Sequence, residues 1–234
     1  MVGIVTLGTT ALISEALYYC DNVADPTAAE YTSRRVRYLL YLQKAAVDFW
    51  MEKEWSWSMR ATSLAAISAE GMGTLPAGFL EVGRSGNLID TATNLPLTSI
   101  DPGAMRVYLE SDVGSSKEYI YSIYSGKDGD GDRYLWVPKG WVGTTTLSLH
   151  YKRIPPLCVD GATDELEEIP ATYQYSVLTP KLFATAFRSL GNPQADIEEA
   201  NYIKGVAKAV SGDPGTQRDS VSVMGGYGIG RKMC

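Results

Sequence analysis

The residues that could do chemistry in this chain are few and scattered. The only histidine, His150, alternates with Leu149 and Tyr151 in a period-two pattern, so we expect it on the opposite, surface face of a strand. One histidine cannot supply a multi-histidine metal site or a two-histidine proton relay. The cysteines have no metal-like spacing and are typical of reduced thiols; they are Cys20, Cys158 and Cys234.

A glycine-spaced acidic run resembles the start of a calcium loop, with Asp128, Asp130 and Asp132 at alternate positions. Arg133 stands where such a loop needs glycine, and Lys139 stands where it needs a bidentate glutamate. A solvated hairpin tip between two aromatic strands is the simpler interpretation.

A second acidic run could in principle provide a general acid and a general base; it comprises Asp160, Asp164, Glu165, Glu167 and Glu168. A charged run is more often a solvated linker, and nothing nearby marks a sugar subsite. The glycines at 225–230 lack the preceding strand and following helix of a dinucleotide loop. We therefore expect a protein without catalysis, without a cofactor and without a bound metal.

The bulk composition limits the partners. With 234 residues, 45% hydrophobic residues and a formal net charge of −6, the chain can build a substantial core, but overall positive charge cannot drive nucleic-acid binding. No apolar run approaches the length of a membrane span, and Met1–Thr10 does not have the pattern of a secretory signal.

Periodicity predicts helices near both ends of the chain. The N-terminal ones span 5–20 and 26–54; the C-terminal ones follow Ile169-Pro170, with a kink at Pro180, and run from Pro193 to Ser211. Gly191-Asn192-Pro193 predicts the end of one helix and the capped start of the next. The expected core stripes are Val36, Leu39, Leu40, Val47 and Trp50 in the second helix, and Ile197, Ala200, Ile203, Val206, Ala207 and Val210 in the last.

The middle of the chain has the character of β structure. Candidate strands are 57–66, 78–82, 119–124, 134–137 and 145–152, with a short helix at 103–109. The fold class is therefore α+β: a helical bundle from the N- and C-terminal segments with an inserted β-rich domain and an extended C-terminal arm. The expected boundaries are 1–56, 57–153, 154–211 and 212–234. Phe49, Trp50, Trp55 and Trp57 are interpreted as the core where the helical part meets the β part.

The order of these elements resembles a known family. The strand T-T-T-L-S-L-H-Y-K-R-I-P-P-L (144–157) is followed by acids and then by I-P-A-T-Y (169–173), which opens a helix. The front half adds the Phe-Trp cluster and an L-P-x-x-F entry at Leu75, Pro76 and Phe79. Over roughly residues 5–210 this order resembles the head-to-tail adaptor proteins of tailed phages, also called connector or head-completion proteins.

The resemblance implies a structural virion protein. Such adaptors form a ring, twelve-fold in the family, between the portal protein and a tail or nozzle protein, and DNA passes through the channel without specific binding. It also implies a location in the neck of the virion, and in the host cytoplasm during assembly, without membrane attachment.

Two sets of residues are the candidate contacts of such an assembly. The C-terminal segment carries apolar side chains between glycines, a pattern that suits a portal-binding arm; they are Val221, Val223, Met224, Tyr227 and Ile229, with Arg231 and Lys232 beyond. Arginines of the second helix could meet the acidic linker of a neighbouring copy, which pairs Arg34, Arg35 and Arg37 with Asp164, Glu165 and Glu168.

Two alternatives remain open. One is a carbohydrate- or calcium-binding β module on a helical stalk, with Trp136 or Trp141 stacking on a sugar. The other is a carboxylate-based hydrolase that uses Asp164 or Glu168.

The first prediction is that 126–132 binds no calcium, because the ligand pattern fails at two positions. Added calcium should leave the melting temperature unchanged, since only a bound ligand stabilises the folded state. A saturable rise in melting temperature that Asp130→Ala removes would contradict this.

Overall fold

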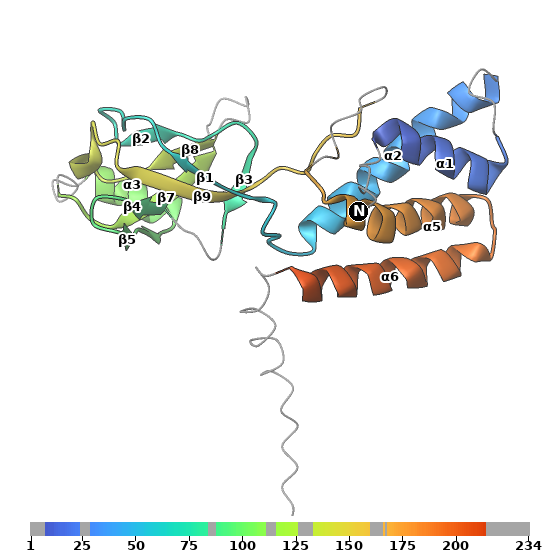
Figure 1. The fold of residues 1–234 in the computed structure, drawn as a ribbon. Helices are drawn as coiled ribbons and strands as arrows, with labels where there is room; N and C mark the ends of the chain where they lie inside the picture. Colours follow the sequence, from blue (N-terminus) through green and yellow to red (C-terminus); the bar gives the residue numbers. More distant parts are fainter. Residues whose placement is uncertain are drawn as a thin grey trace, which may run out of the picture. The chain divides into compact units, whose positions relative to one another are not determined.

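A computed structural model describes residues 8–23, 29–83, 88–110, 116–125, 133–159, 166 and 168–213. The chain is a mixed α+β protein, as the sequence predicts. It divides into two units (Figure 1): a helical unit, Met1–Ser58 with Pro155–Cys234, and a β unit, Met59–Ile154.

The helical unit is built around α5. Its elements are α1 (Thr9–Asp21), α2 (Ala29–Met51), the short α4 (Ala171–Tyr173), a π-helical segment (Gln174–Leu178), α5 (Thr179–Ser189) and α6 (Gln194–Gly212). Helix α5 packs against α1, α2 and α6, and Figure 1 shows it between α2 and α6.

The aromatic cluster predicted from Phe49, Trp50, Trp55 and Trp57 lies in the core of the helical unit. Trp50 and Trp55 are fully buried, and the indole N–H of Trp55 donates to the Phe49 carbonyl at 2.9 Å. Trp55 and Trp57 stack with ring centroids 5.5 Å apart. This packing fixes the chain where it leaves α2.

The predicted core stripes of the two long helices are partly wrong. In α2 the buried side is built by Tyr31, Tyr38, Leu42, Ala45, Ala46, Phe49 and Trp50, while Val36 and Leu40 are exposed. In α6 the buried residues are Ala195, Tyr202, Gly205 and Ala209, with Val206 and Val210 packed at the edge, while Ile197, Ala200, Ile203 and Ala207 are exposed. Both helices are apolar on two sides, and the core uses the side with the tyrosines and the small residues.

The sequence predicts a kink at Pro180, and the structure has a π-helical segment immediately before the helix turn that contains this proline. In a regular helix the Ser176 carbonyl would accept a hydrogen bond from the N–H of residue 180, which proline lacks. Just before Pro180 the helix has a π segment, in which the Thr179 N–H donates to the Gln174 carbonyl five residues earlier. The buried Gln174 amide in turn donates to the carbonyls of Leu166 and Ile169, at 2.8 and 2.9 Å.

Helix α6 comes closest to this segment at Gly205. A Cβ at that position would overlap with the Ser176 carbonyl oxygen, so only glycine permits the approach. The turn before α6 follows the prediction: Gly191 has φ +66°, and the Asn192 side chain accepts from the Gln194 N–H at 3.0 Å.

A buried ion pair joins the ends of α2 and α6. Lys53 lies 3.1 Å from the Asp213 carboxylate, which also accepts from the Ser56 N–H at 3.0 Å. Burial alone would raise the pKa of Asp213, but the hydrogen bonds from Ser56 and Lys53 outweigh it and the pKa lies below the usual range. Asp213 therefore belongs to the folded helical unit, and the predicted arm begins after it rather than at 212.

The β unit contains two sheets. In the first, β9 (Leu147–Arg153) pairs with β1 (Met59–Ser63) along one edge and with β3 (Phe79–Val82) and β4 (Leu88–Asp90) along the other, and β5 (Leu95–Pro96) follows β4. The second has the order β2 (Met72–Thr74), β8 (Arg133–Trp136), β7 (Ile120–Ser125) and β6 (Thr98–Ser99). Helix α3 (Pro102–Glu110) and a 3-10 turn (Lys139–Trp141) complete the unit.

The five predicted strands and the short helix are confirmed, whereas β2, β4, β5 and β6, each of two or three residues, were not predicted. Leu147, Leu149 and Tyr151 are buried and His150 lies on the opposite face of the strand, as expected, although His150 is half-buried rather than exposed. The antiparallel pairing of β7 with β8 places Tyr124 opposite Tyr134, so the strands that flank 126–132 do form a hairpin. The predicted tip itself lies outside the described residues.

The second prediction tests the close approach at Gly205. Alanine has the higher helix propensity, yet Gly205→Ala should lower the free energy of unfolding by about 1–3 kcal/mol, because backbone must move to admit the methyl group. Gly212→Ala is the matched control in the same helix, since its Cβ would meet only the Tyr173 hydroxyl at an ordinary 3.9 Å. Chemical denaturation of both variants measures the difference, and equal stabilities would contradict this packing.

Candidate functional site

The two thiols in the described part of the chain are at least half-buried. Burial, together with the negative charge of Asp21, raises the pKa of Cys20 to about 12, so its thiol stays protonated at neutral pH. Cys158 is a buried free thiol, and Cys234 lies outside the described residues. Among the residues described, no three or more histidine, cysteine or acidic side chains converge on a possible metal position.

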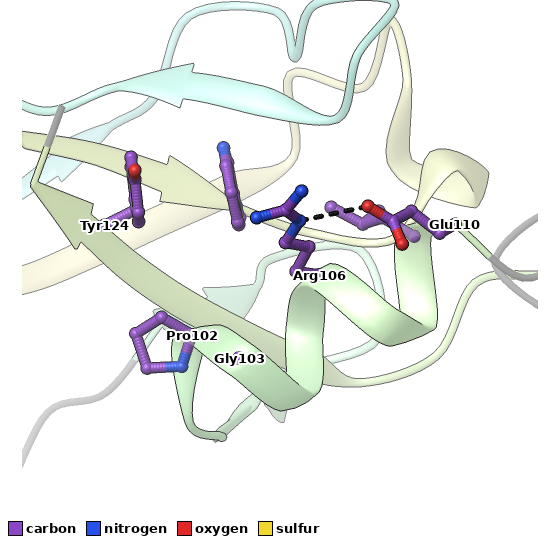
Figure 2. A pocket seen from close by; sticks show the side chains of 7 residues that line it. Pro102, Gly103, Arg106, Glu110 and Tyr124 are labelled. Atoms are coloured by element: carbon purple, nitrogen blue, oxygen red, sulfur yellow. Dashed lines mark hydrogen bonds and ion pairs between the residues drawn. The ribbon is translucent and has the colours of Figure 1, made fainter. Parts of the chain in front are cut away.

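One pocket of the β unit has convergent polar and aromatic groups. Helix α3 lies beside β7 and β8, and a cavity of about 570 Å³ opens between them, lined by Pro102, Gly103, Arg106, Leu109, Glu110, Tyr124 and Trp136. We call it the aromatic pocket. Figure 2 shows Arg106 reaching from α3 toward the side of the pocket where Tyr124 stands.

The register of the hairpin makes the aromatic wall of this pocket. Trp136 is opposite Ser122 and Tyr124 is opposite Tyr134, so Tyr124 and Trp136 are diagonal neighbours on adjacent strands. Their rings stack with centroids 4.6 Å apart and planes 5° from parallel. The stack presents a flat aromatic surface beside a groove that contains a cation and an anion.

The polar rim of the aromatic pocket is one exposed ion pair. The Arg106 Nε donates to Glu110 at 3.0 Å across one turn of α3, and both side chains are largely exposed. Such a pair gains little energy in water and separates easily, so both groups are available to a ligand. A cation, a carboxylate and an aromatic face can together bind a polar ligand with an apolar face.

The helical unit carries the second candidate surface. In α2 an apolar side runs along the helix, and we call it the α2 stripe: the exposed Val36, Leu40 and Met51 and the half-buried Val47. The exposed apolar side of α6 is the α6 stripe: Ile197, Ala200, Ile203 and Ala207. Val36 and Leu40 are 59% and 63% exposed, and Ile197 and Ile203 are 61% and 60% exposed, so both helices present large apolar side chains to solvent.

The opposite side of α6 holds it on the bundle. Lys181 of α5 lies 2.9 Å from Glu199 and 4.4 Å from the centroid of the Tyr202 ring. Burial, with the negative charges of Glu52 and Asp48, raises the pKa of Tyr202 to about 12, so its hydroxyl stays neutral. The polar contacts of α6 thus lie toward the core, and its apolar stripe is left to the outside.

The candidate contacts predicted from sequence are only partly described. Arg34 pairs within its own chain with Asp21, at 3.2 Å, and Arg35 donates to the Tyr31 and Thr10 hydroxyls at 3.1 and 3.3 Å, whereas Arg37 is exposed. Glu168 is half-buried. The remaining predicted residues lie outside the described part of the chain: Asp164, Glu165, Val221, Val223, Met224, Tyr227, Ile229, Arg231 and Lys232.

The two tryptophans considered for sugar stacking differ in how deeply they are buried. Trp136 lines the aromatic pocket, whereas Trp141 is fully buried, stacks edge-on with Tyr119 and donates to the Glu118 carbonyl at 2.8 Å. Sequence reasoning missed Arg106, Glu110 and Tyr124. The only available signal was the short helix predicted before two aromatic strands.

Comparison with known proteins adds no family: the chain matches no protein-family model, and no curated protein matches it. Within the described residues, no helix is both long enough and apolar enough to span a membrane.

The third prediction separates the rim of the aromatic pocket from the core of the β unit. Arg106→Ala should change the free energy of unfolding by less than about 0.5 kcal/mol, because an exposed pair across one helical turn contributes little. Trp141→Ala should cost about 3–5 kcal/mol, because it empties a buried site. Hydrogen exchange of the β9 amides reports the stability of this unit, and a large loss in Arg106→Ala would mean that the ion pair is structural.

Proposed function

We propose that this chain is a structural adaptor that forms a ring between the portal protein and the tail or nozzle protein of a tailed bacteriophage. The observation that carries the proposal is the pair of exposed apolar stripes on α2 and α6, two helices that lie on either side of α5. A subunit with two different adhesive faces can use one face on each neighbour. Such head-to-tail contacts form rings when the rotation closes.

The resemblance of the sequence supplies the identity of this assembly: twelve copies, a location in the neck of the virion, and a role without catalysis. The stripes supply a physical reason for it. Apolar side chains exposed to water raise the free energy of the subunit, and packing them between copies lowers it again.

The charge of the chain suits a channel for DNA. Each copy contributes a formal net charge of −6, so a ring would be strongly acidic. A negative wall repels phosphate over a Debye length of about 8 Å at physiological salt. DNA would then pass through without specific binding.

The C-terminal arm is the proposed link to the portal. Beyond Asp213 the sequence alternates apolar side chains with glycines and ends near Arg231 and Lys232. Its 21 residues could reach at most about 70–75 Å when extended, which is enough to cross a neighbouring subunit. Apolar anchors between glycines allow the backbone to lie close to another surface, as an added strand does.

A carbohydrate-binding module is the second candidate, and the aromatic pocket is the observation that favours it. The Tyr124–Trp136 stack offers a flat face to the C–H side of a pyranose, and Arg106 with Glu110 offers a donor and an acceptor to its hydroxyls. Retention on a glycan resin that Trp136→Ala abolishes would support it. Attachment to portal-bearing particles that is insensitive to Trp136→Ala would leave the adaptor as the primary function.

The fourth prediction tests the arm. Removing residues 214–234 should leave the melting temperature of the chain within about 2 °C, because Asp213 and its partners remain, and should abolish co-sedimentation with portal-bearing particles. In the full chain, Tyr227→Ala with Ile229→Ala should also abolish attachment, while Thr216→Ala with Ser220→Ala in the same segment should not. Full attachment of the truncated chain would place the portal contact elsewhere.

A further inference from the structure

We propose that the α2 stripe of one copy packs against the α6 stripe of the next copy, with the two helices parallel. This contact rests on the proposed ring and specifies the surface through which its subunits meet. The occupant of each stripe is thus a second copy of this chain.

The two stripes match in chemistry and length. Val36, Leu40, Val47 and Met51 fall within about 60° on one side of α2 and extend for about 22 Å, since each residue advances 1.5 Å. In the α6 stripe two isoleucines alternate with two alanines over about 15 Å. Ala200 leaves space between the isoleucines and Ala207 leaves space beyond Ile203, and the larger side chains of α2 can insert there.

The course of the two helices within one copy fixes their relative direction. Lys53, two residues beyond α2, contacts Asp213, the residue that follows α6. Figure 1 shows α2 and α6 running in the same direction on either side of α5. A ring whose rotation axis is roughly parallel to these helices keeps their direction the same in every copy. It can bring the α2 stripe of one copy to the α6 stripe of the next without reversing either helix. Neighbouring copies in a ring therefore present the two stripes in parallel.

The charges beside the stripes favour the same direction. In α2 the exposed charges from Arg37 to Lys44 are basic, while the exposed Glu30 lies in the first turn of the helix. In α6 the exposed charges change from acidic, at Asp196, to basic, at Lys204 and Lys208.

A parallel pairing therefore places Arg37 beside Asp196 of the neighbour. Lys44 and Lys204 are then the one like-charged pair, near the middle. An antiparallel pairing would bring Arg37 to the neighbour's Lys208, where two positive charges would repel.

The test uses the full chain, because each stripe alone is small and pairwise association will be weak. Between about 20 µM and 1 mM the amide resonances of α2 and α6 should shift progressively with concentration, as expected for a dissociation constant near 1 mM or below. Val107 on α3 is a control, since it is an equally exposed apolar residue, 69% exposed, outside both stripes. The absence of shifts up to 1 mM, or shifts confined to other surfaces, would overturn the contact.

Charge exchange tests the direction. Arg37→Glu or Asp196→Arg alone should weaken association by about fivefold or more, and the double variant should recover it to within about twofold of the original chain. Arg106→Glu is the control for a change of the same charge on an exposed helix of the β unit. If Arg37→Glu alone strengthens association and adding Lys208→Glu removes that gain, the parallel arrangement is overturned.

Two further outcomes separate this contact from the proposed function. If Leu40→Asp and Ile203→Asp abolish the concentration-dependent shifts and also prevent ring formation on portal-bearing particles, the contact is supported. If rings form on those particles with both substitutions, the contact is wrong while the adaptor function stands.

Discussion

The helical unit depends on the close approach of α6 to the π segment before α5. Pro180 has no N–H to donate to the Ser176 carbonyl, and in the π segment before α5 the Thr179 N–H donates to the Gln174 carbonyl. Gly205 then lets α6 approach that widened backbone, which a side chain would prevent. With α6 held there, Tyr202 reaches Lys181 and Asp213 reaches Lys53, so the last helix is fixed along its whole length.

Much of this fold could be predicted from the sequence, because its main signals are local. Alternation in 145–152 marked the central strand β9, and Gly191-Asn192-Pro193 marked the turn between α5 and α6. Pro180 predicted a kink, but not the π segment that precedes it. The shortest strands were not predicted because two or three residues carry no period; they exist only because β9 and β8 offer them backbone partners.

The core faces of α2 and α6 could not be predicted correctly, for a physical reason. Hydrophobicity alone predicts a buried face that contains Val36, Leu40, Ile197 and Ile203. Dense packing instead buries the side of each helix that allows its neighbours to approach closely. Alanines at 45, 46 and 209 and the glycine at 205 allow that approach, and the tyrosines close its edges. When a helix is apolar on two sides, the helices that pack against it determine which side is buried. The aromatic pocket was unpredictable for a related reason, because the stacking of Tyr124 on Trp136 follows from the hairpin register.

The exposed aliphatic side chains give the chain two small apolar surfaces, the α2 stripe and the α6 stripe. The small area of each surface limits how strongly two copies can associate. Stripes of four side chains along about 15–22 Å of helix bury only a few hundred Å² per copy, well below the roughly 800 Å² per partner of a stable complex. Copies of net charge −6 also repel one another at low ionic strength. A free chain of this kind remains mostly monomeric, whereas in a closed ring each copy gains two contacts, and a portal that holds the copies together raises their effective concentration. Weak two-sided faces thus favour assembly on a partner over assembly in solution, because only the partner removes the entropy cost that each small contact cannot offset by itself.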